Sequence, residues 1–153
     1  VDRASVLLIE AFKPSGRSVL DLGCGYGAVG LFIKALYRNQ TVCLSDINER
    51  AVEFAMLNAS NNGLEIKSNL FSAFEGITFD DIVTNPPIAA GKRLLTDLIN
   101  EAYSHLNQNG SLWLVAYHNK GGATLKEIMK KRFGNAVDLE KSGGIRVYRS
   151  TVT

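Results

Sequence analysis

Residues 19–30, Val-Leu-Asp-Leu-Gly-Cys-Gly-Tyr-Gly-Ala-Val-Gly, decide the fold class of this 153-residue chain. They join a buried strand, expected at Ser18–Leu22, to a glycine-rich turn and then to a helix that continues to about Tyr37. Glycines at such a turn let the backbone approach a ligand, and the helix that follows presents free N–H groups. In doubly wound sheets, ligands bind at the carboxyl ends of the strands, so this turn is a candidate cofactor site.

The glycine spacing by itself leaves the ligand open. Gly25, Gly27 and Gly30 satisfy the GxGxxG pattern, and Asp46 ends the next expected strand twenty-one residues after Gly25. The pattern is compatible with NAD, with S-adenosylmethionine, or with a tight turn that binds nothing. Asp46 can accept both ribose hydroxyls of either cofactor, but an acid at this place can also cap a helix.

A second informative stretch is Thr84-Asn85-Pro86-Pro87-Ile88, which follows an expected strand at 81–84. Prolines cannot donate ladder hydrogen bonds, so the strand stops there, and each proline holds the residue before it extended. The resulting corner presents a carboxamide and a backbone carbonyl, two hydrogen-bond acceptors suited to holding an amine. An ordinary proline-terminated strand would have the same sequence.

Strands and helices alternate along the chain. The expected helices are 4–12, 28–37, 49–62, 92–106 and 122–133, and the expected strands are 18–22, 41–45, 65–68, 81–84, 111–117, 136–141 and 145–150. This order predicts a single three-layer α/β domain over residues 1–153, doubly wound around a mostly parallel sheet. Asn109-Gly110 predicts a turn before the fifth strand, and Ser142-Gly143-Gly144 predicts a closing antiparallel hairpin.

The composition is that of a globular protein, with 46% apolar and 21% charged residues. No apolar run approaches the ~20 residues of a membrane span, and no signal peptide opens the chain. Cys24 and Cys43 form neither a metal-binding spacing nor a disulfide framework. We therefore expect a protein of the reducing cytoplasm without a metal or a membrane partner. Because the chain begins at Val1, we also expect the natural protein to extend upstream.

The formal charge of +2 is unevenly distributed. Residues 1–91 contain seven Lys/Arg and ten Asp/Glu, a net charge of −3, whereas residues 92–153 contain ten and five, a net charge of +5. A solvated helix face accounts for part of the basic half, and a surface that faces a polyanion would account for it as well.

Three motifs, each at the end of a strand, together resemble the class I S-adenosylmethionine-dependent methyltransferases. Residues 19–30 resemble their opening signature, Ser45-Asp46-Ile47-Asn48 their ribose-binding acidic segment, and Asn85-Pro86-Pro87-Ile88 the N-P-P-(aromatic) motif of the amino-methylating members. The combination argues against NAD, since a dehydrogenase has no use for an Asn-Pro-Pro corner.

A closer resemblance covers nearly the whole chain. Residues 21–30, 68–71, 81–88 with Gly91-Lys92, and 143–147 are similar to the methyltransferase small domain group. This group includes the guanine-N2 methyltransferases of small-subunit ribosomal RNA and compact archaeal relatives. The resemblance implies a seven-stranded sheet in the order 3-2-1-4-5-7-6, with strand seven antiparallel.

The same resemblance implies the site residues. Those implied to bind the cofactor are Asp21, Gly23, Cys24, Gly25, Tyr26, Asp46, Ile47, Asn69 and Leu70, and those implied to be catalytic are Asn85, Pro86, Pro87 and Ile88. Within the first set, Asp46 would hold the ribose, and Asn69 and Leu70 would flank the adenine.

We interpret the Asn-Pro-Pro corner as an amine holder. The Asn85 side-chain oxygen and the Pro86 carbonyl would accept the two N–H bonds of an exocyclic amine and aim its lone pair at the methyl group. No strong base is needed, because an alkylated nitrogen loses its proton easily. His105 and His118 therefore have no assigned catalytic role, and a structural role is the simpler interpretation of both.

The leading interpretation is an enzyme that methylates N2 of guanine in ribosomal RNA, with Lys92, Lys120 and Arg146 as candidate phosphate ligands or merely exposed charges. Methylation of adenine N6 or of a protein glutamine amide, a non-catalytic docking module, and a NAD-dependent oxidoreductase remain as alternatives.

Two departures from the family pattern stand out. Ile88 replaces the aromatic residue that stacks on the target base in many members, and Tyr26 and Tyr117 are candidates for that stacking, though each also suits the core or its rim. The further strands that usually precede the segment matching residues 2–5 are missing from this sequence.

Overall fold

The computed structural model describes residues 2–70 and 75–153, so Phe71 of the family resemblance lies outside the described residues. The strands are β1 (Ser18–Leu22), β2 (Thr41–Asp46), β3 (Lys67–Leu70), β4 (Phe79–Thr84), β5 (Leu106–Tyr117), β6 (Val137–Ser142) and β7 (Ile145–Thr151). The helices are α1 (Arg3–Ala11), α2 (Ala28–Leu36), α3 (Glu49–Asn61), α4 (Lys92–Ser104) and α5 (Gly122–Phe133), with short 3-10 turns η2 (Ile88–Ala90) and η3 (His118–Lys120).

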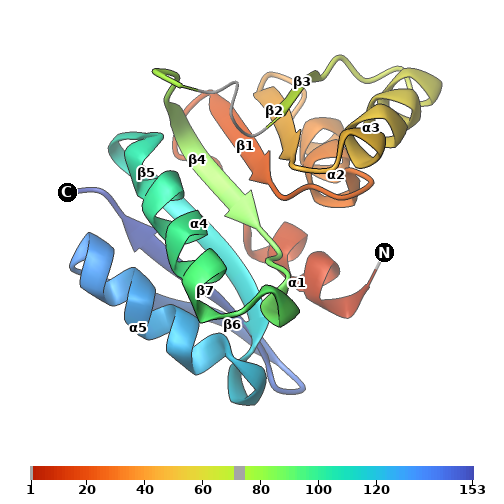
Figure 1. Cartoon of the computed structure of the whole chain (residues 1–153). Coiled ribbons are helices and arrows are strands. Elements are labelled where there is room, and N and C mark those ends of the chain that lie inside the picture. Colours follow the sequence, from red (N-terminus) through yellow and green to blue (C-terminus); the bar gives the residue numbers. More distant parts are fainter. Residues whose placement is uncertain (1, 71–74) are drawn as a thin grey trace.

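The described strands form one seven-stranded sheet in the order β3-β2-β1-β4-β5-β7-β6 (Figure 1). Strands β1 to β5 are mutually parallel, and β7 runs antiparallel to both of its neighbours, β5 and β6. The expected strand order and the antiparallel strand seven are therefore confirmed. Strand β1 lies between β2 and β4, which is where the winding of the chain changes direction.

Helices cover both faces of the sheet, as the three-layer prediction requires. One hydrophobic core lies under α4 and α5, built on Leu95, Ile99 and Met129, with Ile82 from the sheet. The other lies under α1, α2 and α3 and includes Leu8 of α1. Since the helices after β1 and after β4 pack on opposite faces, their preceding loops diverge at the sheet edge and leave room between them.

The prediction of a turn at Asn109-Gly110 was wrong. Helix α4 ends at Ser104, and β5 begins at Leu106 and passes through both residues. Asn109 does adopt a left-handed conformation, with φ of 68°, but its N–H donates to the Val152 carbonyl at 2.8 Å. The residue therefore forms an irregularity within β5, where the register with β4 shifts.

The other errors concern the ends of strands. The third strand lies at Lys67–Leu70, two residues later than expected, and the fourth begins at Phe79, two residues earlier. The closing hairpin is confirmed, and Gly143 and Gly144 occupy its turn with φ of 54° and 84°. Within the described part of the chain, no helix has the length and apolarity that crossing a membrane would require.

Candidate active site

The carboxyl ends of β1, β2 and β4 and one side of α4 surround a cleft of about 490 Å³, which is within the usual size of a ligand site. Six of its lining residues end or follow the three strands, namely Leu22, Gly23, Asp46, Ile47, Asn85 and Pro87. The parallel arrangement explains this convergence, because adjacent parallel strands deliver the residues that follow them to the same edge. Motifs more than sixty residues apart in sequence thus share one cleft.

The glycine loop forms one wall of the cleft. Gly23 and Gly25 have φ of 70° and 55°, and a Cβ atom at either position would meet no other atom. Glycine is therefore favoured at both positions by the left-handed backbone conformation, and the loop has open space on its outer side. Asp46 shapes it: one carboxylate oxygen accepts the Gly25 N–H at 2.9 Å, and the other accepts the Asn48 N–H at 2.9 Å.

Asp21 lies behind the loop rather than in the lining of the cleft. Its side chain is 2% exposed and accepts the Gly30 N–H at 2.8 Å, which ties β1 to the start of α2. Burial raises the pKa of Asp21 to about 7, and the nearby Asp46 charge adds to this effect. Burial likewise raises the pKa of the Cys24 thiol to about 12, so this cysteine stays protonated and is a poor nucleophile.

The Asn-Pro-Pro corner forms the opposite wall. The Thr84 hydroxyl donates to the Leu22 carbonyl at 2.9 Å, which joins the end of β4 to the end of β1. Pro86 is buried and Pro87 is exposed in the cleft. The Asn85 side-chain nitrogen donates to the Ser5 hydroxyl on α1 at 3.1 Å.

Ile88 begins η2 and packs against the core under α4 and α5. A Cβ atom at Gly121 would lie 3.0 Å from its side chain. The segment after β5 therefore closely approaches the corner, and the absence of a side chain at Gly121 makes room for Ile88.

The family profile described as "Methyltransferase small domain" matches residues 1–149. The chain belongs to this family. Members of the methyltransferase small domain family use S-adenosylmethionine, so this chain is an S-adenosylmethionine-dependent methyltransferase domain and the family prediction is confirmed.

Individual relatives support this assignment. The chain is 34% identical to an uncharacterized Bacillus subtilis protein, YbxB, over 98% of this chain and 78% of that protein. It is 38% identical to ribosomal RNA small subunit methyltransferase C of Haemophilus influenzae, over 97% of this chain but 46% of that protein. The chain thus spans about half the length of the methyltransferase C relatives that it matches.

Solved structures agree with the fold. The T. thermophilus 16S rRNA N2 G1207 methyltransferase (RsmC), in complex with AdoMet and guanosine, superposes with a TM-score of 0.85 at 27% identity, over 100% of this chain and 44% of that one. A methyltransferase from Pyrococcus furiosus superposes with a TM-score of 0.79 at 22% identity, over 95% of this chain and 80% of that one. At that identity, the second similarity shows the fold alone.

The cleft fits the cofactor of the family. Each Asp46 oxygen that accepts a backbone N–H retains a lone pair for a ribose hydroxyl, because a carboxylate has about four acceptor positions. The open glycine loop leaves space beside Asp46, and Ile47, 87% exposed, adds an apolar surface at the rim. Backbone pairing places Asn69 beside Ser45 and Leu70 beside Asp46, where the resemblance expects the adenine.

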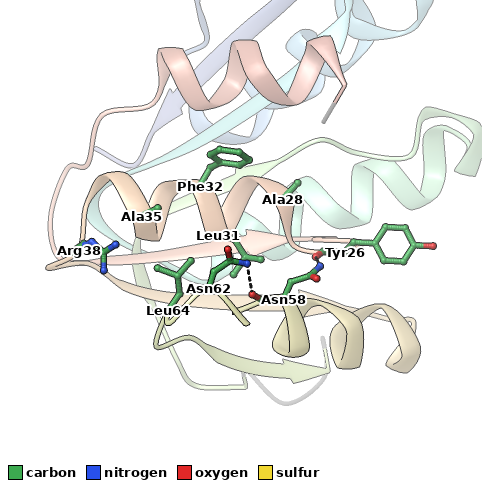
Figure 2. Close-up of a pocket in the computed structure, with 9 residues that line it drawn as sticks. All are labelled: Tyr26, Ala28, Leu31, Phe32, Ala35, Arg38, Asn58, Asn62 and Leu64. Carbon is green, nitrogen blue, oxygen red and sulfur yellow. Dashed lines mark hydrogen bonds between the residues drawn. The ribbon is translucent and has the colours of Figure 1, made fainter. Parts of the chain in front are cut away.

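Tyr26 lies away from this cleft. Its side chain is 69% exposed, and it lies at one end of a separate cavity of about 450 Å³ between α2 and α3 (Figure 2). Figure 2 shows its phenol ring pointing away from the other lining residues, while Asn58 donates to the Tyr26 carbonyl at 3.4 Å. The two cavities share no lining residue among those described, so the ring of Tyr26 does not line the cleft that contains Asp46 and Asn85.

The three candidate phosphate ligands have different surroundings. Lys92 lines a groove between α4 and α5. Lys120 lies over the ring of Tyr117, 5.7 Å from its centroid, and that tyrosine is half exposed. Arg146 forms an ion pair with Asp138 at 3.2 Å, so part of its charge is already neutralised.

Neither histidine lines the cleft. His105 caps the end of α4, where its Nε2 lies 3.3 Å from a Glu101 carboxylate oxygen. His118 follows β5, and its Nδ1 lies 2.6 Å from the hydroxyl of the buried Tyr148. Among the described residues, no group of three or more His, Cys, Asp or Glu side chains is placed to hold a metal ion.

The α4 wall of the cleft was not predicted from the sequence; it consists of Leu94, Leu95, Asp97, Leu98 and Glu101. Leu95 and Leu98 have the helical spacing of a core-facing stripe, and Leu95 is buried. Leu94 could have indicated this wall, because it is an apolar residue outside the buried stripe of α4 and is largely exposed. Ser5 was also missed as the partner of Asn85, because eighty residues separate them.

Proposed function

We propose that this domain transfers the methyl group of S-adenosylmethionine to an exocyclic amine of a nucleobase, and that the amine is N2 of guanine in ribosomal RNA. The observation that carries the proposal is the position of Asn85, which lines the same cleft as Gly23 and Asp46. The proposed cofactor loop and the proposed amine holder thus share one cavity.

In this proposal the corner acts by orientation. The Asn85 oxygen and the Pro86 carbonyl accept the two amine N–H bonds, which draws the nitrogen lone pair out of conjugation and toward the methyl group. When bound, S-adenosylmethionine would supply a methyl group on a sulfonium sulfur; transfer would exchange the S–C bond for an N–C bond and release one amine proton to solvent. The proposal assigns no general base, and both histidines lie outside the cleft lining.

The basic groove between α4 and α5 supports a polyanionic substrate. It has a volume of about 540 Å³ and is lined by Lys92, Thr96, Thr124, Glu127, Ile128, Lys130 and Lys131. Within the described parts of the chain, none of its three lysines forms an ion pair, whereas the neighbouring Lys126 pairs with Asp138. Lys92 connects the groove to the corner, because α4 begins there directly after η2.

The relatives favour guanine among the possible bases. The T. thermophilus protein is an N2 methyltransferase of 16S rRNA, solved with guanosine bound, and the H. influenzae relative is named as a ribosomal RNA small subunit methyltransferase. Ile88 at the corner can press against a base but cannot stack aromatically on it, so we expect guanine to be held mainly by its amine and its edge.

The test is transfer of labelled methyl groups to unmodified ribosomal RNA, DNA and protein in parallel, with Asn85→Ala beside the wild type. We expect label in RNA as N2-methylguanosine and its loss in the variant, with cofactor affinity retained. Label in adenine or in protein glutamine would refute the proposed substrate, and wild-type activity in Asn85→Ala would refute the proposed amine holder. Cofactor binding without transfer to any pool would favour the docking-module interpretation.

A salt titration tests the groove separately. Replacing Lys130 and Lys131 with alanine should weaken RNA binding and reduce the dependence of log affinity on log salt by about 0.7 to 0.9 for each phosphate that is no longer neutralised. Lys13→Ala removes a lysine outside the groove and serves as the control. An unchanged salt dependence in the double variant would exclude the groove as a binding surface for RNA.

A further inference from the structure

The hydrogen bond from Asn85 to Ser5 joins the proposed amine holder to the N-terminal helix. The Asn85 side-chain nitrogen lies 3.1 Å from the Ser5 hydroxyl oxygen, across eighty positions of sequence. Ser5 is 6% exposed, while Asn85 is only partly buried and lines the cleft. One end of the carboxamide is therefore held by α1, and the other end remains for a ligand.

We propose that Ser5 is a positioning residue, which restrains the Asn85 carboxamide by accepting its side-chain N–H, so that the side-chain oxygen is left to face the substrate amine. This inference rests on the proposed function. A carboxamide has a donor end and an acceptor end, and rotation by half a turn about its terminal torsion exchanges them at little steric cost. The substrate amine presents N–H donors, so the rotated carboxamide would oppose donor to donor and lose the bond that orients the nitrogen.

The position of Ser5 is itself well determined. Its backbone N–H donates to the Asp2 carboxylate at 2.7 Å, which caps the first turn of α1. At the other end of the helix, Phe12 is buried, and its ring centroid lies 5.2 Å from that of Trp113 on β5. Strand β5 pairs directly with β4, which carries Asn85 at its end. Ser5 and Asn85 are thus held against the same part of the sheet.

A positioning role and a merely structural role affect different measured quantities. If the Ser5 hydroxyl orients Asn85, Ser5→Ala should lower kcat by about three- to tenfold, the value of one hydrogen bond of this kind, and leave the affinity for S-adenosylmethionine unchanged. Ser5→Thr retains a hydroxyl and should stay within about twofold of wild type. A residue that only holds α1 in place would change thermal stability instead.

The experiment compares Ser5→Ala, Ser5→Thr and Ala4→Gly at a temperature at which circular dichroism shows all of them folded. Ala4→Gly weakens α1 through helix propensity while it keeps the Ser5 hydroxyl, so it is the matched control. The measurements are kcat, KM for RNA, and the dissociation constant for S-adenosylmethionine by calorimetry. We expect a selective loss of kcat in Ser5→Ala, with rescue by threonine.

Two results with the single variants would overturn the inference. One is a wild-type kcat in Ser5→Ala, and the other is an equal loss of kcat in Ala4→Gly, which would attribute the effect to α1 as a whole. A further arm adds Ser5→Ala to Asn85→Ala under single-turnover conditions; the residual rate should not fall again, and an additive fall would also overturn the inference. Failure of the proposed function can be distinguished from failure of this inference. In the first case the wild-type protein itself methylates none of the substrates, whereas in the second it is active and only the comparison of variants differs from the expectation.

Discussion

Replacing Asp21 with asparagine should remove a large part of the pH dependence of folding. Burial raises the pKa of Asp21 from 3.8 to about 7 in the folded protein. Between these two values the unfolded chain has released the proton while the folded protein still holds it, so rising pH favours unfolding. The stability associated with the protonated carboxyl is present at low pH and is lost as pH rises toward 7.

The size of the effect follows from the two pKa values. A shift of about three units corresponds to about 4 kcal/mol of unfolding free energy in total. Part of this is already lost below pH 5, which leaves about 2.5 kcal/mol to be lost between about pH 5 and about pH 8. This is a large share of the marginal stability of a domain, so it should be readily measurable.

The assay is urea unfolding of the cofactor-free protein at intervals over that pH range. Asparagine keeps the volume of the side chain and an oxygen that can accept the Gly30 N–H, but it does not titrate. Burial also raises the pKa of Asp81, but that contribution is common to both proteins and cancels in the difference. Two curves that remain parallel from about pH 5 to about pH 8 would refute the reasoning.

Three further substitutions test the packing and the cofactor site. Gly30→Ala would press a Cβ atom into a Leu44 methyl group. We expect urea unfolding to show that the free energy of unfolding falls by about 1–3 kcal/mol, despite a gain of about 1 kcal/mol in helix propensity. Wild-type stability would mean that the Leu44 side chain moves aside freely. Trp113→Phe removes a 2.9 Å hydrogen bond to the fully buried Asp81 and should cost about 1–3 kcal/mol by the same assay, unless solvent reaches that carboxylate. Asp46→Ala removes the proposed ribose acceptor and should weaken S-adenosylmethionine binding at least about tenfold in calorimetry; unchanged affinity would remove Asp46 from the cofactor site.

The sequence allowed the strand-end motifs to be predicted because each is local. Gly23 and Asp46 follow short apolar runs directly, and prolines mark the end of β4 without ambiguity. Asn109-Gly110 misled for a physical reason: a left-handed residue suits a turn and a bulge equally well, and only the pairing with Val152 decides between them. The order of the strands came from the family resemblance, since no local signal specifies which strands become neighbours.

The parts of the site that were missed are those supplied by distant packing. Leu94 lines the cleft because α4 lies along one side of it. Ser5 reaches Asn85 because α1 packs on β5 and β7, and β5 is the neighbour of β4. Both contacts depend on how helices dock onto the sheet. The hydrophobic period of a helix shows which face it buries, but it does not show which residue lies next to a particular loop.

The two halves of the chain have different tasks in the proposed reaction, and the charge distribution agrees with that division. Asp46 and the glycine loop belong to the acidic half, residues 1–91, whose net charge of −3 suits a cofactor that carries a sulfonium. The groove between α4 and α5 belongs to the basic half, whose net charge of +5 suits a nucleic acid. Transfer requires the two ligands to meet, and the chain passes from the acidic to the basic half at the start of α4, directly after the Asn-Pro-Pro corner and η2. The pairing of β1 with β4, extended by the hydrogen bond from Thr84 to Leu22, holds the proposed cofactor loop beside the proposed amine holder.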